Sequence, residues 1–209
     1  MGIVYDGGFR TMNKLGLVNL ISLNLFLQST SMKPFTVPTY EQVPADARPA
    51  FDQFKRLMGK MPNLYATIGY SANALNSYLH YVSEQARGTF HAKDREAIYL
   101  IVSQLNGCEY CLASHTLSAI KNGWKEEETL ALRAGTIVDQ KWEVIYRVIH
   151  SIIEQKGLVS DELLDEFYAL GYQEAAIIDL MVLVNVMSFT NYTYRLTHIP
   201  IDFPLAKDI

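Results

Sequence analysis

The two cysteines of the chain stand close together, because only two residues separate Cys108 from Cys111. Glu96 precedes the pair by twelve positions, and His115 follows it by four. Two thiols, an imidazole and a carboxylate can carry out thiol redox chemistry, since a base beside a thiol promotes the reactive thiolate. These four residues are therefore the candidate functional site.

Both cysteines are predicted to lie in the first turn of a helix, since Asn106-Gly107 ends the preceding one. Free backbone N–H groups and the helix dipole favour an anion at that position. Lowering a thiol pKa from about 8.5 to about 6.5 raises its ionised fraction at pH 7 from about 3% to about 75%. The position alone therefore favours a reactive thiolate.

Residues three, four and seven positions apart share one face of a helix, so Cys108, Cys111 and His115 should project together. At a rise of about 1.5 Å per residue, His115 lies about 6 Å along the axis from Cys111 and about 10 Å from Cys108. His115 is thus better placed to take the proton of Cys111, directly or through one water. Glu96 lies in the preceding apolar helix, where a buried carboxylate needs a partner that His115 could supply.

Each candidate residue also has an ordinary structural interpretation. Glu96 could stabilise the first turn of its own helix through the dipole, and His115 could be a solvated or core histidine. The cysteines could simply fill apolar space. The joint spacing favours a functional site over these alternatives. The remaining histidines have no spacing that suggests a set of metal ligands: His80, His91, His150 and His198.

The composition is that of a folded globular protein, with 49% apolar and 19% charged residues. The net charge of -4 argues against a sequence-independent nucleic-acid binder, which needs a surplus of Lys and Arg on one face. A single close cysteine pair also differs from the spread cysteines of a disulfide-stapled secreted domain. We expect a cytoplasmic protein without a nucleic-acid or membrane partner.

Residues 1–31 differ from the rest and are predicted to be an extension of a single domain spanning residues 32–209. The extension contains an apolar stretch, Leu15 to Leu27, that is too short to span a bilayer. It has the outline of a signal peptide, but Asp6 weakens the basic end and three polar residues dilute the stretch. The alternatives are translation that starts at Met32 and an added amphipathic helix.

Helical spacing of apolar residues runs through the domain, without an alternating strand pattern or a hairpin turn. The sequence therefore predicts an all-α protein, a compact multi-helix bundle. The last predicted helix is apolar over most of its circumference, so it must be buried in a core or against another subunit. The predicted helices span residues 45–58, 64–86, 92–105, 108–122, 125–133, 140–155, 161–169 and 173–196.

Glu96, Cys108, Cys111 and His115 are separated by eleven, two and three residues, and this pattern resembles the core motif of the alkylhydroperoxidase D-like proteins. Those proteins belong to the carboxymuconolactone decarboxylase superfamily. The resemblance covers about residues 45–200. It implies an all-helical fold, usually assembled as a trimer or hexamer, and thiol-dependent peroxidase or disulfide-exchange activity.

The resemblance also implies roles for the four residues. In such proteins the second cysteine, here Cys111, reacts with the peroxide, and the first, here Cys108, resolves it. Glu96 and His115 would form the proton relay. An external dithiol, from a lipoyl or thioredoxin-like protein, would reduce the pair again, and no bound cofactor is needed.

One position departs from the family pattern. The best-studied members carry a histidine immediately before the second cysteine, and Tyr110 occupies that position here. The departure removes one proton carrier from the expected relay.

Two other functions remain open. One is a decarboxylase like the other branch of the superfamily, which does not depend on paired cysteines and is disfavoured for that reason. The other is a non-catalytic zinc module, for which the four candidate residues supply the right number of tetrahedral ligands. Helix-borne thiols beside an acid more often serve redox chemistry.

Overall fold

The structure is a computed structural model that describes residues 35–209. The predicted domain boundary at residues 31 and 32 lies outside this range. Over the described range the chain is all-helical, as predicted, and contains no strand. Its elements are η1 (Ala45–Ala47), α2 (Arg48–Met58), α3 (Asn63–Ile68), α4 (Ala72–Glu84), η2 (Gln85–Arg87), α5 (Ala92–Leu105), α6 (Glu109–Lys121), α7 (Glu126–Ala134), α8 (Gln140–Glu154), α9 (Asp161–Ala169) and α10 (Glu174–Thr197).

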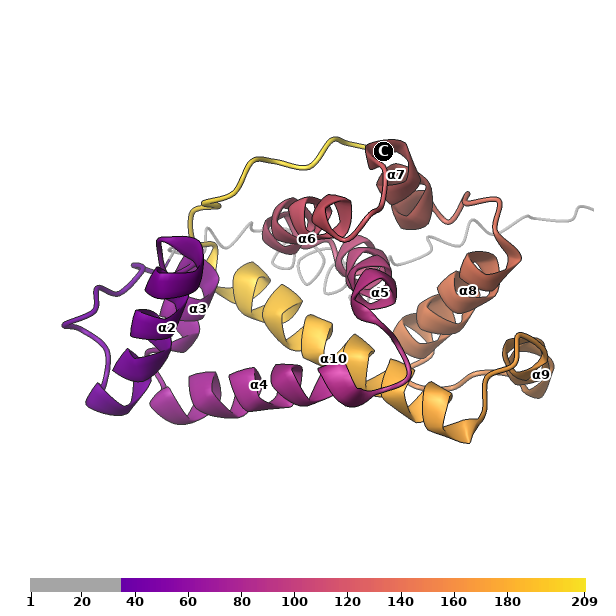
Figure 1. Cartoon of the computed structure of the whole chain (residues 1–209), viewed down its shortest axis with the longest axis horizontal. Coiled ribbons are helices and arrows are strands. Elements are labelled where there is room, and N and C mark those ends of the chain that lie inside the picture. Colours follow the sequence, from indigo (N-terminus) through magenta and orange to yellow (C-terminus); the bar gives the residue numbers. More distant parts are fainter. Residues whose placement is uncertain (1–34) are drawn as a thin grey trace, which may run out of the picture. The chain divides into compact units, whose positions relative to one another are not determined.

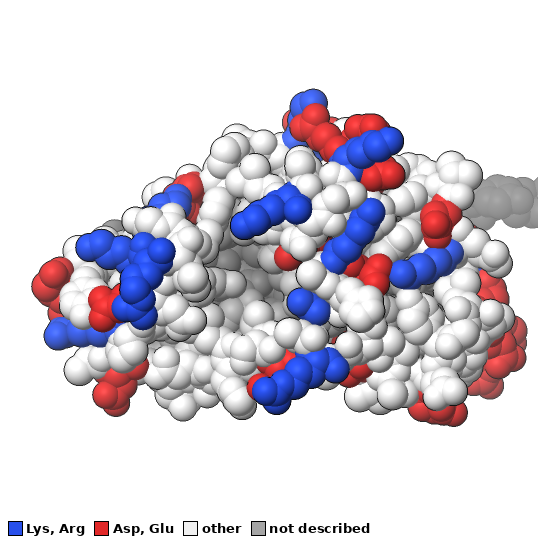
Figure 2. Space-filling model, viewed as in Figure 1, with Lys and Arg blue, Asp and Glu red and all other residues white. Residues whose placement is uncertain are grey.

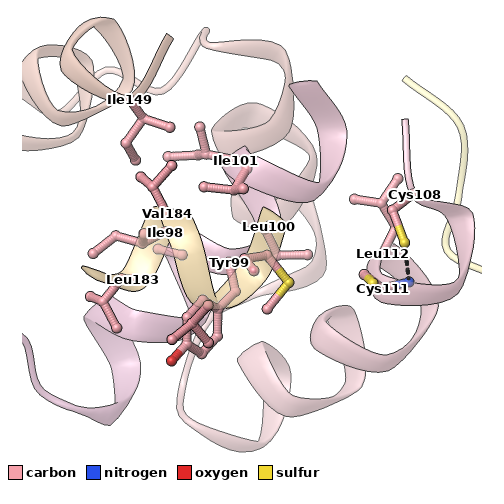
Figure 3. Packing of buried hydrophobic residues seen from close by; sticks show 14 of the residues in the cluster. Ile98, Tyr99, Leu100, Ile101, Cys108, Cys111, Leu112, Ile149, Leu183 and Val184 are labelled. Atoms are coloured by element: carbon pink, nitrogen blue, oxygen red, sulfur yellow. Dashed lines mark hydrogen bonds between the residues drawn. The ribbon is translucent and has the colours of Figure 1, made fainter. Parts of the chain in front are cut away.

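Helices α5 and α10 form the centre of the bundle (Figure 1). Helix α5 packs against α6, α7, α8 and α10. Every residue of its middle section, Ala97–Ser103, is buried, because neighbouring helices enclose this helix on all sides. Ile98, Ile101, Ile149 and Leu183 belong to the resulting core (Figure 3).

Helix α10 is the one helix within residues 35–209 that could cross a membrane by length and composition, with a mean hydropathy of 1.5 over its most apolar window. In the structure it packs against α3, α4, α5, α6 and α8. It also buries three polar side chains, Thr190, Asn191 and Thr197. Its apolar character is that of a core helix in this bundle.

The predicted single helix over residues 64–86 is wrong, because the chain turns between α3 and α4. Ser71 is extended, and its Oγ accepts the N–H of Ala74 at 3.2 Å, which caps the start of α4. Gly69 is needed before it, since a Cβ there would lie 2.8 Å from the carbonyl oxygen of Ala66. The turn lets α3 and α4 form two different walls of the site described below. The other predicted helix ends agree with the structure to within one residue, except that residues 45–47 form the 3-10 turn η1 and α2 begins at Arg48.

The turn between α5 and α6 positions the cysteines. Gly107 has a φ of +64°, a left-handed conformation that favours glycine. Cys108 follows as the N-cap residue of α6, with extended backbone angles, and Cys111 lies in the first helical turn. The prediction that both thiols lie in the first turn is therefore wrong for Cys108.

Residues 198–209, which we call the C-terminal strap, leave α10 and run past α6 to α7 (Figure 1). At the far end, Lys207 Nζ pairs with Glu126 at 2.6 Å. Arg133 Nη1 donates to the carbonyl oxygen of Lys207 at 2.6 Å. These contacts tie the strap to α7.

Candidate functional site

Glu96 and His115 meet, with Nδ1 of His115 2.7 Å from Oε2 of Glu96. An ionised carboxylate can only accept a hydrogen bond, so Nδ1 carries the hydrogen and Nε2 remains free to exchange a proton. The ring of Tyr99 packs against the imidazole with the ring centroids 5.0 Å apart. The histidine is therefore held in a defined orientation, as the sequence analysis anticipated.

Cys108 and Cys111 are free thiols, and both are buried. The backbone N–H of Cys111 donates to Sγ of Cys108 at 3.3 Å, the dashed line in Figure 3. This is an N-cap interaction in which a sulfur takes the place of a serine or threonine hydroxyl. The sulfur of Cys108 is thus turned back towards the start of α6.

The two thiols hold their protons differently. Burial raises the pKa of Cys111 well above its usual value, and the neighbouring sulfur of Cys108 raises it further. Burial also opposes ionisation of Cys108, but hydrogen bonds from Cys111 and Asn191 and the charge of Arg195 outweigh it and lower the pKa of Cys108. The pair therefore carries its first negative charge on Cys108. The expected lowering of both thiol pKa values is wrong for Cys111.

A pocket of about 250 Å³ opens beside Cys111. It lies in the surface hollow between α2, α4 and α6 that Figure 2 shows, and its walls are mostly uncharged. Cys111, His115 and Glu96 line the pocket, whereas Cys108 lies behind it, fully buried. The structure thus brings three of the four predicted residues to one cavity and places the fourth against its inner side. The aromatic wall consists of Phe54, Tyr65, Tyr78, Tyr99, Tyr110 and Phe203.

The tyrosines of this wall stay neutral. Burial raises the pKa of Tyr65 to about 12, and it also raises the pKa values of Tyr78 and Tyr99. Neutral phenols add hydrogen-bonding groups without adding charge. Tyr65, Tyr78 and Tyr99 were not predicted as site residues, because they come from α3, α4 and α5, whose meeting point no local pattern reveals.

Tyr110 faces the pocket but acts as an anchor. Its hydroxyl donates to Oδ1 of Asp202 at 2.6 Å and accepts the N–H of Leu64 at 3.1 Å. Burial and the hydrogen bond to Asp202 raise its pKa. Asp202 also pairs with Lys60 at 2.8 Å, and the ring of Phe203 packs edge-on against Tyr110. Tyr110 therefore fastens the C-terminal strap to the pocket wall.

The four predicted residues do not gather as metal ligands. In the part of the chain that the structure describes, no group of three or more His, Cys, Asp or Glu side chains could hold a metal ion. One ring nitrogen of His115 is already engaged by Glu96. This geometry argues against the zinc module.

Comparison with protein families places this site in a known context. The sequence model of the carboxymuconolactone decarboxylase family matches residues 71–150, which include all four candidate residues. This match supports the assignment of that part of the chain to the carboxymuconolactone decarboxylase superfamily. The same range carries the α5–α6 turn, so the family match covers the elements that position the cysteines. A search of curated protein sequences found no significant match.

Several solved structures share the alkylhydroperoxidase D-like fold of this chain. An uncharacterized peroxidase-related protein from Silicibacter sp. TM1040 gives a TM-score of 0.70 at 17% identity, over 82% of this chain and 94% of its own. The alkylhydroperoxidase AhpD core protein from Ralstonia eutropha JMP134, also peroxidase-related, gives 0.73 at 14% identity, over 83% and 94%. The debrominase Bmp8, as a cysteine-to-alanine variant in complex with 2,3,4-tribromopyrrole, gives 0.66 at 16% identity, over 84% and 93%. At these identities the likeness establishes the fold.

Proposed function

We propose that this protein is a thiol-dependent peroxidase that reduces organic hydroperoxides through Cys111 and Cys108, with His115 and Glu96 as the proton relay. One observation carries the proposal. The thiol that holds its proton, Cys111, lines a pocket together with the histidine, while the thiol that gives up its proton, Cys108, lies directly behind it.

The first step oxidises Cys111. Its sulfur attacks the distal oxygen of the hydroperoxide, the O–O bond breaks, and the proton of Cys111 passes to the thiolate of Cys108. The departing alkoxide takes a proton from the imidazolium of His115, whose positive charge Glu96 stabilises. The products are a sulfenic acid on Cys111 and an alcohol.

The second step forms the disulfide. The sulfur of Cys108 bonds to that of Cys111, and its proton leaves with the sulfenic hydroxyl as water. In sum, two thiols and a hydroperoxide become a disulfide, an alcohol and water. An external dithiol, from a lipoyl or thioredoxin-like protein, then reduces the disulfide by two successive exchanges.

The pocket favours an organic over an inorganic peroxide. Its mostly uncharged, aromatic wall can bury an apolar substituent, while His115 and Cys111 face the peroxide group. The phenols of Tyr65 and Tyr99 supply neutral hydrogen-bonding groups within the same wall.

Assembly into a trimer or hexamer is part of the proposal. Three large apolar side chains on one face of α10 are exposed and spaced to form a continuous stripe: Phe189, Tyr192 and Leu196. Light scattering on a size-exclusion column should give a mass that is a multiple of the chain mass. Leu196→Glu should reduce that mass, and a monomeric wild-type protein would contradict the assembly.

Thiol counting before and after a hydroperoxide tests the function directly. The reduced protein should show two free thiols, and none after one equivalent of cumene hydroperoxide. Cys108→Ser should accumulate a sulfenic acid on Cys111 that a dimedone adduct reveals by mass spectrometry. Cys111→Ser should lose the reaction altogether, at least 100-fold in rate. If the wild-type protein keeps both thiols free, the proposed function is wrong.

Reductive dehalogenation of an aromatic compound is a second candidate, which the aromatic wall of the pocket favours. The debrominase Bmp8 shares the fold and holds a brominated pyrrole in its structure. The same dithiol could supply the two electrons, so that an aryl bromide and two thiols would give the debrominated ring, bromide, a proton and a disulfide. Release of bromide from 2,3,4-tribromopyrrole by the reduced protein would favour this candidate, and its absence would exclude that substrate.

A further inference from the structure

The pocket beside Cys111 has a buried floor and a partly exposed rim. Cys111 and Tyr110 are buried and form part of the floor. Met58 and Phe203 line the same pocket but keep part of their surface in contact with solvent, so they belong to the rim. A molecule that reaches the sulfur of Cys111 through this pocket must therefore pass the rim.

Phe203 reaches the rim from the C-terminal strap, which passes α6 without helical structure (Figure 1). It is the one residue of the strap that lines the pocket. A segment outside the helices is commonly more mobile than the elements that it crosses. Whether the ring of Phe203 forms a fixed part of the wall therefore depends on its contacts.

Three groups hold Asp202, the residue before Phe203. Oδ1 of Asp202 accepts the hydroxyl of Tyr110 at 2.6 Å, and Oδ2 pairs with Nζ of Lys60 at 2.8 Å. The backbone N–H of Asn63, the first residue of α3, also donates to Oδ2 of Asp202 at 3.3 Å. These bonds join the strap to α3 and to α6, so the strap can move away from the pocket only if several of them break.

The ring of Phe203 is fixed as well. It packs edge-on against Tyr110, with the ring centroids 5.6 Å apart and the planes at 88°. Nζ of Lys60 lies 4.9 Å from its centroid. Nδ2 of Asn63 donates to the carbonyl oxygen of Pro200 at 3.0 Å, which holds the strap shortly before the ring. The ring is therefore a fixed part of the pocket wall.

The volume of the pocket limits what can fit beside this fixed ring. A cavity of about 150 Å³ holds one benzene molecule, and this pocket measures about 250 Å³. It therefore has room for a peroxide group and a substituent of about one aromatic ring. A larger substituent fits only if a wall moves, and a packed wall resists such a movement.

We propose that Phe203 is a specificity-determining residue that sets the upper size of the substrate, which is an organic hydroperoxide with a compact substituent of about one ring. The inference rests on the proposed function for the peroxide group. Discrimination of this kind works through a clash with the larger molecule. A smaller side chain at position 203 should therefore admit bulkier molecules, and a larger one should exclude more of them.

Alkylation of Cys111 by two maleimides tests the inference without any peroxide. N-ethylmaleimide and N-(1-pyrenyl)maleimide carry the same reactive group on substituents of very different size. In a Cys108→Ser background Cys111 is the one remaining thiol. There, Phe203→Ala should raise the ratio of the pyrenyl to the ethyl rate constant by about tenfold. Phe203→Trp should lower that ratio below the value of the unchanged pocket.

Phe35→Ala is the matched control, because Phe35 lines a separate hollow beside Tyr70 and Thr197. It should leave the ratio of the rate constants unchanged. A folded Phe203→Ala protein whose ratio equals that of the unchanged pocket overturns the inference. If circular dichroism shows that Phe203→Ala does not fold, Phe203→Leu replaces it, since it keeps an apolar side chain at the rim and removes the ring. A rise is again expected, and an unchanged ratio again overturns the inference.

Hydroperoxides then separate this inference from the proposed function. In proteins that keep both cysteines, Phe203→Ala should raise the rate of thiol oxidation by triphenylmethyl hydroperoxide relative to that by cumene hydroperoxide, again by about tenfold. If the maleimide ratio shifts but neither hydroperoxide oxidises the thiols, the proposed function is wrong, and Phe203 still limits the size of the molecules that enter. If hydroperoxides oxidise the thiols but their rate ratio does not respond to Phe203→Ala, the proposed function stands and this inference is wrong.

Discussion

Two environments meet at the start of α6, an aromatic pocket around Cys111 and a polar cluster around Cys108. The pocket removes water from a thiol and provides little to stabilise its charge. The cluster of Ser103, Asn106 and Asn191 is equally buried from water, yet hydrogen bonds from Cys111 and Asn191 and the charge of Arg195 lower the pKa of Cys108. Burial alone therefore does not decide the protonation of a thiol, and the available donors do.

The helix start adds to the difference. The N–H of Cys111 points to the sulfur of Cys108, so the N-cap residue receives the hydrogen bond that the residue three positions later donates. Two identical side chains in one short motif thus acquire different roles. Cys111, which lines the pocket, is suited to contact a substrate, and Cys108, beside the polar cluster, is suited to carry the negative charge.

Loss of His115 should have the largest effect of all on the rate at which Cys111 is oxidised in the pocket. His115→Asn should slow peroxide-driven thiol loss by about 100-fold or more, because no group remains to protonate the alkoxide. The thiolate absorbance of Cys108 should stay near the wild-type value, since the polar cluster is untouched. Stopped-flow measurement of thiol oxidation and a pH titration check the two parts separately.

His150→Asn is the control for this variant, because His150 is exposed on α8 and its ring stacks on that of Tyr146. A rate for His115→Asn within threefold of the wild type would remove His115 from the mechanism.

Substitution of Tyr110 tests whether this residue anchors the C-terminal strap to the outer wall of the pocket. Tyr110→Phe leaves Asp202 without its buried donor and should lower the free energy of unfolding by about 1–3 kcal/mol. A loosened strap should also speed the reaction of Cys111 with a bulky thiol reagent more than with a small one. Urea unfolding and paired alkylation rates measure both effects.

Tyr40→Phe is the matched control, because Tyr40 donates to Asp52 at 3.3 Å in an exposed pair. It should cost less than Tyr110→Phe, and equal costs would mean that the strap is not anchored by Tyr110.

The smallest expected effect is a pH-dependent difference in stability. The folded pKa of Cys108 lies below its ordinary value of 9.0, so its stabilising contribution is present above pH 9 and is lost as the pH falls through the folded value. The raised pKa of Cys111 acts in the opposite sense, and its contribution is lost above pH 9 as the pH rises through its folded value. Between pH 7 and 9 the Cys108 contribution should therefore change most.

A comparison of the reduced wild-type protein with the reduced Cys108→Ser variant isolates the contribution of Cys108 to stability. The difference in unfolding free energy should move in favour of the wild type as the pH rises from 7 to 9, by about 1.4 kcal/mol for each pH unit between the folded and unfolded pKa. Urea titrations at several pH values measure it. A flat difference over this range would place the charge elsewhere than on Cys108.

Helix positions were largely accessible to sequence reasoning. Apolar spacing located α5, α8, α9 and α10 to within one residue at each end. The failure between α3 and α4 has a clear cause, since apolar periodicity continues across the break. The turn depends on the space around Gly69, which the ring of Phe51 and the carbonyl of Ala66 restrict.

By itself the sequence determined that Glu96 and His115 would meet beside Cys111, because helix periodicity and a short turn leave few other places for them. Only the tertiary structure decided which thiol carries the charge and what Tyr110 does. Those outcomes depend on Asn191 and Asp202, which lie far along the chain and reach the site only through the packing of α10 and the strap. Local spacing describes the neighbours along one helix, whereas the electrostatic environment of a buried group depends on every element that encloses it.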